Sequence, residues 1–146
     1  MHATRQLCTF YLDGHFFGVD AQSVQEVIRY QEMTVVPLTP ECVKGLINLR
    51  GQIVTAIDMR KRLGLQDRPA DKLPMNVVVR SDEGAVSLLV DQIGDVIEVS
   101  SEDFETPPET LRGLARSLVQ GAYKLNGRLL LVLNCEQAVQ VVNDQI

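Results

Sequence analysis

Two stretches of this chain align with each other without a gap. Residues 44–58 have the sequence KGLINLRGQIVTAID, and residues 120–134, 76 positions further along, have the sequence QGAYKLNGRLLLVLN. Each copy contains two glycines around a leucine, an apolar run of strand length and a final residue able to cap a helix. These shared features indicate an internal duplication. The matching positions are Gly45 and Gly121, Leu49 and Leu125, Gly51 and Gly127, and Asp58 and Asn134.

A second match precedes each copy. Val19-Asp20 resembles Val90-Asp91 at an offset of 71 positions, and the sequence EVI at 26–28 resembles DVI at 95–97 at an offset of 69. We therefore predict two pseudo-repeated subdomains of about 70 residues, which are small enough that they should pack on each other. Their approximate limits are 14–70 and 71–134, and the polar segment 66–74, which contains two prolines, lies at the boundary.

The rest of the pattern is typical of an all-β protein. Ten short apolar runs are bounded by Gly, Asp, Asn or Pro, which predicts strands joined by turns in a small barrel or sandwich. Asp13-Gly14 and Asn126-Gly127 predict two-residue hairpin turns of the primed type, and residues 81–84 predict a third turn. The predicted strands are Leu7–Leu12, Phe16–Asp20, Val24–Tyr30, Leu46–Leu49, Ile53–Ile57, Met75–Val79, Val86–Val90, Val96–Val99, Leu118–Tyr123 and Leu129–Leu133.

Only a few short helices are expected. Asp58 can cap a helix over 59–63 that Gly64 would end, and Asn134 can cap a C-terminal helix over 135–142. Asp20 can cap one or two turns over 21–25. The domain as a whole is predicted to cover residues 5–142.

Composition excludes several classes of protein. The chain has 146 residues, 45% of them hydrophobic, which is enough to bury a core. A net charge of −5 argues against nucleic acid or an anionic membrane surface as the partner. We find no apolar run near the roughly 18 residues that a membrane helix needs, and no signal peptide. Cys8, Cys42 and Cys135 are an odd, widely spaced set, which favours buried thiols in a reducing cytosol.

Residue patterns that carry catalysis or metal binding are missing from the sequence. There is no phosphate-binding P-loop, no HExxH zinc motif and no GxSxG nucleophile motif. The two histidines, His2 and His15, lie near the terminus and in a predicted turn, so a histidine-based acid/base or metal site is not expected. Asp91 and Asp95 could act as a carboxylate pair, but a solvated acidic face is the simpler interpretation.

Charge is distributed unevenly along the chain. Residues 43–62 contain five bases and one acid, whereas residues 81–111 contain nine acids and no base. Opposite local fields would suit head-to-tail contacts between similar domains, although a chance distribution of solubilising charges explains the same pattern. Arg50, in a predicted hairpin turn, has two readings: an internal ion pair, for example with Glu26, or a contact with a protein partner.

At these residues the sequence resembles the CheW family, the adaptor domain of bacterial chemotaxis arrays. The resemblance covers residues 5–142, and its most specific part is the run GLINLRG at 45–51. No receiver or kinase domain is attached, so the chain resembles the stand-alone adaptor. The matching stretches are Phe10–Asp20, Val24–Arg29, Pro37, Val43–Val54, Ile57–Arg60, Leu89–Asp91, Val96–Ile97, Gly121 and Leu129–Asn134.

The resemblance implies a fold of two five-stranded SH3-like barrels packed together and no enzymatic activity, metal or cofactor. It implies a cytoplasmic protein, associated with the membrane only through receptor arrays, that bridges a CheA-type histidine kinase to the cytoplasmic tips of chemoreceptors. The kinase's regulatory domain is a paralogue of this family, and such domains associate in rings, which would give the charge asymmetry a use.

Two sets of contact residues follow from the resemblance. The receptor-facing groove between the subdomains would involve Val24, Glu26, Gly45, Leu49, Arg50 and Gly51, and Ile53, Val54 and Arg60 would contact the kinase. Two alternatives stay open: an adaptor of another chemosensory pathway, such as surface motility or development, or a small β-barrel ligand-binding protein.

Overall fold

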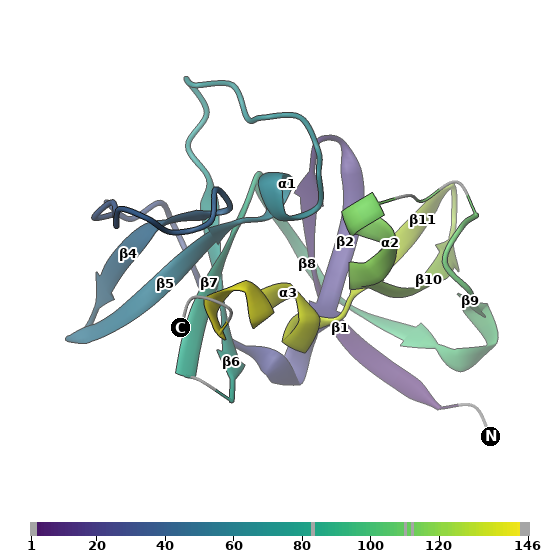
Figure 1. Ribbon diagram of the computed structural model, residues 1–146. Helices are drawn as coiled ribbons and strands as arrows, with labels where there is room; N and C mark the ends of the chain where they lie inside the picture. The colour runs from purple at the N-terminus through teal and green to yellow at the C-terminus, as the bar shows by residue number, and fades with distance from the viewer. Residues whose placement is uncertain (1–2, 83, 110, 112, 144–146) are drawn as a thin grey trace.

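The computed structural model describes residues 3–82, 84–109, 111 and 113–143, and its elements are mainly β-strands (Figure 1). This confirms the prediction of an all-β chain with a few short helices. The strands are β1 (Thr4–Leu12), β2 (His15–Asp20), β3 (Val24–Ile28), β4 (Val43–Leu49), β5 (Gln52–Asp58), β6 (Met75–Ser81), β7 (Gly84–Val90), β8 (Gln92–Ser100), β9 (Phe104–Glu105), β10 (Val119–Leu125) and β11 (Arg128–Leu133). The helices are α1 (Met59–Arg62), α2 (Gly113–Leu118) and α3 (Cys135–Asn143), with 3₁₀ turns η1 (Ala21–Ser23) and η2 (Ser101–Asp103).

The strands form a five-stranded and a six-stranded sheet. The five-stranded sheet has the order β3-β6-β7-β5-β4, and the six-stranded sheet has the order β8-β1-β2-β11-β10-β9. In each sheet one pair of neighbours is parallel: β5 with β7, and β11 with β2. All other neighbours within the two sheets are antiparallel.

The sheets do not divide the chain at the predicted limits of 14–70 and 71–134. The five-stranded sheet takes β6 and β7 from the second half, and the six-stranded sheet takes β1 and β2 from the first. The reason is that β5 pairs with β7, and β11 with β2, in parallel. Parallel neighbours need a long crossover connection and not a tight hairpin, so each pair joins strands that are far apart in sequence. Each sheet is therefore completed by a hairpin from the other half of the sequence.

The duplication itself is confirmed in the topology. Strands β1, β2, β3, β4 and β5 correspond to β6, β7, β8, β10 and β11, and α1 corresponds to α3. Replacing each strand by its counterpart converts the order of the five-stranded sheet into that of the first five strands of the other. The internal repeat therefore describes a pseudo-symmetric molecule whose two halves exchange their first hairpins.

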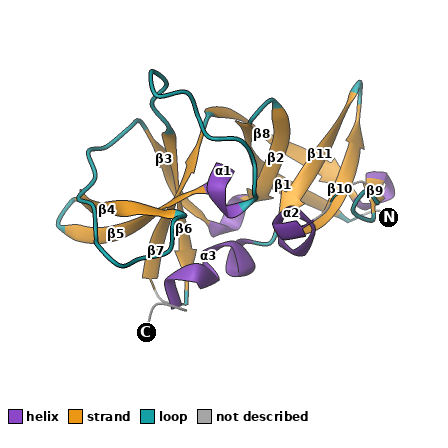
Figure 2. Cartoon of the chain, turned by 45° about the horizontal axis from the view of Figure 1, so that its top comes forward, coloured by secondary structure: helices purple, strands orange, loops and turns teal. Residues whose placement is uncertain are grey.

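Three hydrophobic clusters hold this arrangement together. The largest draws buried residues from both sheets and from all three helices, including Phe10 and Val19 of one sheet and Ile57 and Leu88 of the other. Figure 2 shows α1 and α3 between the two sheets, where their buried side chains join this central cluster. Each sheet also encloses a smaller cluster of its own. Because burial of apolar area is the main favourable term in folding, the shared central cluster binds the halves into one domain.

The paired glycines of the repeat stand where another segment crosses the sheet edge. Thr34 forms an isolated bridge with Leu46, and a Cβ atom at position 45 would lie 2.6 Å from the carbonyl oxygen of Thr34. In the other half β9 pairs with β10, and a Cβ atom at Gly121 would collide with the Phe104 ring. Gly45 is thus required by packing within the chain and is buried beneath Thr34, and its predicted place in the receptor groove stays a prediction.

Local signals in the sequence predicted most of the turns and caps. The Asp58 carboxylate accepts hydrogen bonds from the amides of the first turn of α1, and the Gln137 amide donates to Asn134 at the start of α3. Asp13 and Gly14 are both left-handed, as the primed turn requires. Asn126 is not left-handed, so the turn before Gly127 is not of the predicted type. Helix α2 and strand β9 were not predicted.

No helix in the described parts of the chain combines the length and apolar character needed to cross a membrane.

Replacing Gly45 with alanine should lower the free energy of unfolding by about 1–3 kcal/mol, because the new methyl group must displace the Thr34 backbone. Lys44→Ala, at an exposed neighbour on the same strand, is the matched control and should change it by less than about 0.5 kcal/mol. Urea unfolding followed by circular dichroism measures both. Equal midpoints for the two variants would show that Thr34 does not constrain position 45.

Candidate functional site

The β4–β5 hairpin ends in a tight turn that projects a cation across the edge of its sheet. Arg50 and Gly51 have φ values of 53° and 83°, and the Gly51 amide donates to Asn48 Oδ1 at 3.0 Å. The Arg50 guanidinium donates two hydrogen bonds to the Glu26 carboxylate, at 2.7 and 2.6 Å. Since β3 and β4 are the two outer strands of the five-stranded sheet, this bidentate pair links its opposite edges.

The pair is internal but remains open to solvent. The Arg50 side chain is 73% exposed, whereas that of Glu26 is 16% exposed. The hydrogen bond from Arg50 lowers the pKa of the Glu26 carboxyl, and the charge of Arg50 adds to the effect against a smaller opposing effect of burial. The internal pairing of Arg50 is therefore observed, and the guanidinium keeps a free face that a partner could reach.

The other residues predicted for the receptor groove are buried or half-buried, and they lie in the strands that carry this turn and Glu26. Leu49 is buried in the small cluster of the five-stranded sheet, beside Ile47 and Val54. Val24 is half-buried against the central cluster, and its carbonyl oxygen accepts a hydrogen bond from Arg80 at 3.3 Å. The structure brings Glu26, Arg50 and Gly51 together, while Val24, Gly45 and Leu49 shape the strands that carry them.

Of the three residues predicted to contact the kinase, only Ile53 is exposed. Its side chain is 61% exposed, whereas Val54 is completely buried and Arg60 is nearly so. Alternation along β5 explains the difference between Ile53 and Val54, because neighbouring strand residues point to opposite faces. Arg60 lies on α1 and is buried by its pairing with Asp91. The side chains of Val54 and Arg60 are therefore turned into the protein, so a direct contact of either with the kinase is not supported by their burial.

Sequence reasoning missed Val27, the neighbour of Glu26 on β3. Its side chain is 40% exposed, at one of the outward-facing positions of this strand. The sequence contains a signal for it. Val27 is two positions from Gln25 and so on the same outward face of β3, where a half-buried strand is expected to carry a polar residue. Val27 and Ile53 thus supply exposed apolar area on the two strands that the Glu26–Arg50 pair also involves.

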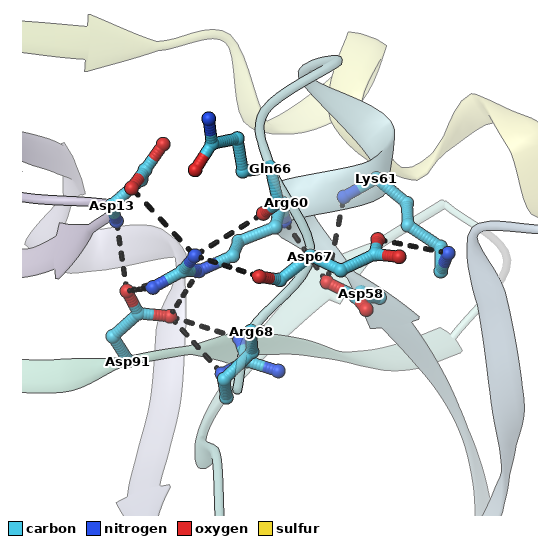
Figure 3. Close-up of polar contacts among 8 residues, drawn as sticks. All are labelled: Asp13, Asp58, Arg60, Lys61, Gln66, Asp67, Arg68 and Asp91. Atoms are coloured by element: carbon cyan, nitrogen blue, oxygen red, sulfur yellow. Dashed lines mark hydrogen bonds and ion pairs between the residues drawn. The ribbon is translucent and has the colours of Figure 1, made fainter. Parts of the chain in front are cut away.

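A second polar cluster lies at the junction of the two sheets (Figure 3). Arg60 donates to Asp91 from Nε at 3.0 and 3.1 Å and from Nη2 at 2.6 Å, and Arg68 Nε donates to the same carboxylate at 3.1 Å. The Asp13 backbone amide donates to Asp91 Oδ2 at 2.8 Å. Asp91 is therefore an internal acceptor, and its interpretation as part of a solvated acidic face is wrong.

These contacts also bear on the charge asymmetry. Arg50 pairs with Glu26, Arg60 with Asp91, and Lys61 with Glu41 and Asp67. Arg62 donates to the carbonyl oxygens of Gln137 and Ala138 in α3, at 2.9 and 3.1 Å. Four of the five bases in residues 43–62 are thus engaged within the chain, which weakens the hypothesis that this segment offers a basic docking surface.

The cysteines show no arrangement suited to nucleophilic or metal chemistry. Cys8, Cys42 and Cys135 are free thiols, all half-buried, and burial raises the pKa of each. For Cys135 burial, together with the charges of Glu136 and Asp20, raises the pKa to about 12. Within the described residues no group of three or more His, Cys, Asp or Glu side chains could hold a metal ion.

Comparisons with known proteins agree in pointing to a single family. The model of the CheW-like domain matches residues 6–143. The chemotaxis protein CheW of Klebsiella aerogenes is 30% identical over 91% of this chain and 80% of its own length, and the probable chemotaxis protein CheW of Rhizobium etli is 31% identical over 90% and 85%.

A solved structure gives the same result. The scaffolding protein TtCheW from Thermoanaerobacter tengcongensis superposes with a TM-score of 0.86, covering 99% of this chain and 98% of that chain at 27% identity. The similarity identifies the two sheets described above as two SH3-like barrels.

Replacing Arg50 with asparagine should raise the pKa of the Glu26 carboxyl toward its ordinary value, because the lowering comes first from the Arg50 hydrogen bond. Asparagine tolerates the left-handed backbone at this turn, so the hairpin should persist. Carbon-detected NMR titration of Glu26 in both proteins measures the shift. An unchanged pKa would mean that the pair is not formed in solution.

Cys135 should not react with Ellman's reagent at pH 8 while the protein is folded. At a pKa of about 12, only about one thiol in ten thousand is ionised at that pH, and the thiolate is the reacting species. The rate can be followed by absorbance in the wild type and in Cys135→Ser. Equal numbers of rapidly reacting thiols in the two proteins are expected, and one fewer in Cys135→Ser would contradict the prediction.

Proposed function

Because this chain belongs to the family of CheW-like domains, we propose that it couples chemoreceptors to a CheA-type histidine kinase as a non-enzymatic adaptor. Proteins of this family are non-catalytic scaffolds of chemotaxis signalling. The observation that carries the proposal is the match of the family model and of a scaffolding protein's structure over nearly the whole chain. The adaptor acts in the cytoplasm, beside the membrane that holds the receptors.

The receptor-facing surface is proposed to centre on the Glu26–Arg50 pair. Its guanidinium is largely exposed although it is already fixed in direction, and Val27, the next residue after Glu26 on β3, is an exposed apolar residue of the same strand. Such a combination suits the side of a receptor helix that carries apolar residues and a carboxylate or amide, since arginine is enriched at binding hot spots and amphipathic helices dock through their apolar face. Gly45 and Leu49 act here by shaping the barrel.

The kinase-facing surface is proposed to include Ile53, on the outer face of the β4–β5 hairpin. Its exposed side chain is one of the larger apolar groups on this surface, and it needs only an apolar recess on the partner. Val54 supports it from the inside of the same strand, within the small core of its barrel.

In this role the chain contributes geometry and no chemistry. Receptor and kinase are held at fixed positions on one rigid domain, so a change in the receptor alters the balance between active and inactive kinase. Each contact is expected to be weak by itself, and repetition of the contacts in an array supplies retention.

The proposal is tested by pull-downs of the intact chain against a receptor cytoplasmic fragment and the kinase regulatory domain. Wild-type protein should retain both. Arg50→Asp should lose the receptor fragment and keep the kinase, because it reverses the exposed charge and abolishes the bidentate pair. Ile53→Asp should do the reverse, because a carboxylate would replace the exposed apolar side chain.

Lys124→Asp is the matched control, since Lys124 lies on the other barrel at an exposed site near the end of β10 and should retain both partners. Circular dichroism spectra and melting curves of all variants should superpose on those of the wild type. Absence of both partners from the wild-type pull-down would refute the adaptor role, and equal losses in all three variants would refute the assigned surfaces.

A further inference from the structure

Asp91 occupies the point where the chain passes from one sheet to the other. It lies between β7 of the five-stranded sheet and β8 of the six-stranded sheet, and its own amide donates to the Tyr11 carbonyl oxygen of β1 at 3.0 Å. Its side chain is 16% exposed. A carboxylate in this position can bind groups from both barrels at once.

The groups around the carboxylate come from three separate segments. Arg60 belongs to α1, directly after β5 of the five-stranded sheet, and Arg68 belongs to the loop that joins α1 to β6. The Asp13 amide belongs to the β1–β2 turn of the six-stranded sheet, and Asp13 Oδ1 lies 3.7 Å from Arg60 Nη1. Figure 3 shows these groups converging on Asp91.

Arg60 extends the cluster into the loop before β6. Its Nη1 donates to the carbonyl oxygens of Gln66 and Asp67, at 3.2 and 3.3 Å. Two interactions therefore hold the loop in place. Arg60 binds the loop's backbone carbonyl oxygens, and Arg68, which belongs to the loop, binds Asp91. Loss of the Asp91 charge would leave two buried guanidinium groups without their shared counter-ion, which is costly in a partly desolvated site.

The internal repeat provides a comparison within the same molecule. The position equivalent to Arg60 is Glu136, 76 residues on, and the position equivalent to Asp91 is Asp20, 71 residues back. Two acids cannot form an ion pair, so the pseudo-symmetric junction lacks this interaction. The fold therefore does not require the cluster at both junctions, and the one at Asp91 is an addition on one side.

We propose that Asp91 is a positioning residue that fixes the angle between the two barrels, and that this fixed angle transmits the receptor's state to the kinase. The second part rests on the proposed function. The central hydrophobic cluster holds the barrels together without strong directional preference, whereas the ion pairs and the Asp13 hydrogen bond are directional.

The charge state of Asp91 agrees with this role. Burial acts to raise the pKa of its carboxyl, but the hydrogen bonds from Arg60 and Asp13 and the charges of Arg60 and Arg68 outweigh it and lower the pKa. The group stabilises the folded arrangement fully above its ordinary pKa, and this contribution is lost as the pH falls through the lowered value. The junction should therefore be firm at neutral pH and loosen only in acid.

The angle is tested by distance measurements between spin labels on the intact chain. Labels are placed at Gln52→Cys and Lys124→Cys, exposed sites on different barrels, after the three native cysteines are replaced by alanine. Wild type should give one narrow distance distribution. Asp91→Asn, which keeps the shape and removes the charge, should broaden it, and Asp91→Glu should restore part of the narrowing.

Asp95→Asn is the matched control, an exposed acid on β8 whose side chain should leave the distribution narrow. Arg68→Gln keeps the Arg60–Asp91 pair and should broaden the distance distribution less than Asp91→Asn does. It provides a second test of the positioning role if Asp91→Asn does not fold. Hydrogen exchange at the Asp13 amide should lose protection in Asp91→Asn. An unchanged distribution in both Asp91→Asn and Arg68→Gln would overturn the positioning role.

The signalling part is tested separately. Asp91→Asn should retain receptor and kinase in pull-downs yet lose receptor control of kinase activity. Unaltered control with a broadened distribution would overturn the signalling part alone. Failure of the wild type to bind either partner would refute the proposed function, while the label distances would still decide the positioning role.

Discussion

The structure depends on two parallel pairings, β5 with β7 and β11 with β2. Each brings a hairpin from one half of the sequence into the sheet of the other half, so neither sheet is complete without both halves. The central hydrophobic cluster follows from this exchange, because strands from both halves turn apolar faces toward the same space. The glycines at 45 and 121 and the caps of α1 and α3 are local adjustments within that frame.

Much of the fold could be predicted from the sequence because its signals are local. The turn at Asp13-Gly14 and the caps at Asp58 and Asn134 depend on neighbouring residues, and the repeat is visible as matched spacing. The division into barrels could not be predicted in the same way. Which strand pairs with which depends on contacts far apart in sequence, and the alternation of apolar residues is the same for either partner.

The candidate site, too, combines features that the sequence indicates with features that depend on tertiary contacts. The internal pairing of Arg50 with Glu26 is observed because the structure brings the outer strands of one sheet together, and the partner contact of Arg50 stays a prediction. The family resemblance placed Arg60 at a kinase-facing surface, and Asp91 was interpreted as part of a solvated acidic face, yet both side chains are largely buried as partners of each other. The burial of Arg60 and Asp91 depends on a tertiary contact between segments 31 residues apart, so no local sequence pattern predicts it.

The exchange of hairpins also determines what a single repeat can do as a folding unit. A single repeat, β1 to α1, contains β1 and β2 in one sheet and β3 to β5 in the other, so alone it can complete neither. With the strand pairings of this chain, one repeat on its own would therefore leave strands of both sheets without their neighbours. Two copies joined in one chain supply each other's missing hairpins, so each sheet is completed within the same molecule. The two junctions between the sheets are nevertheless chemically different. Arg60 pairs with Asp91 at one of them, whereas the equivalent positions at the other hold Glu136 and Asp20.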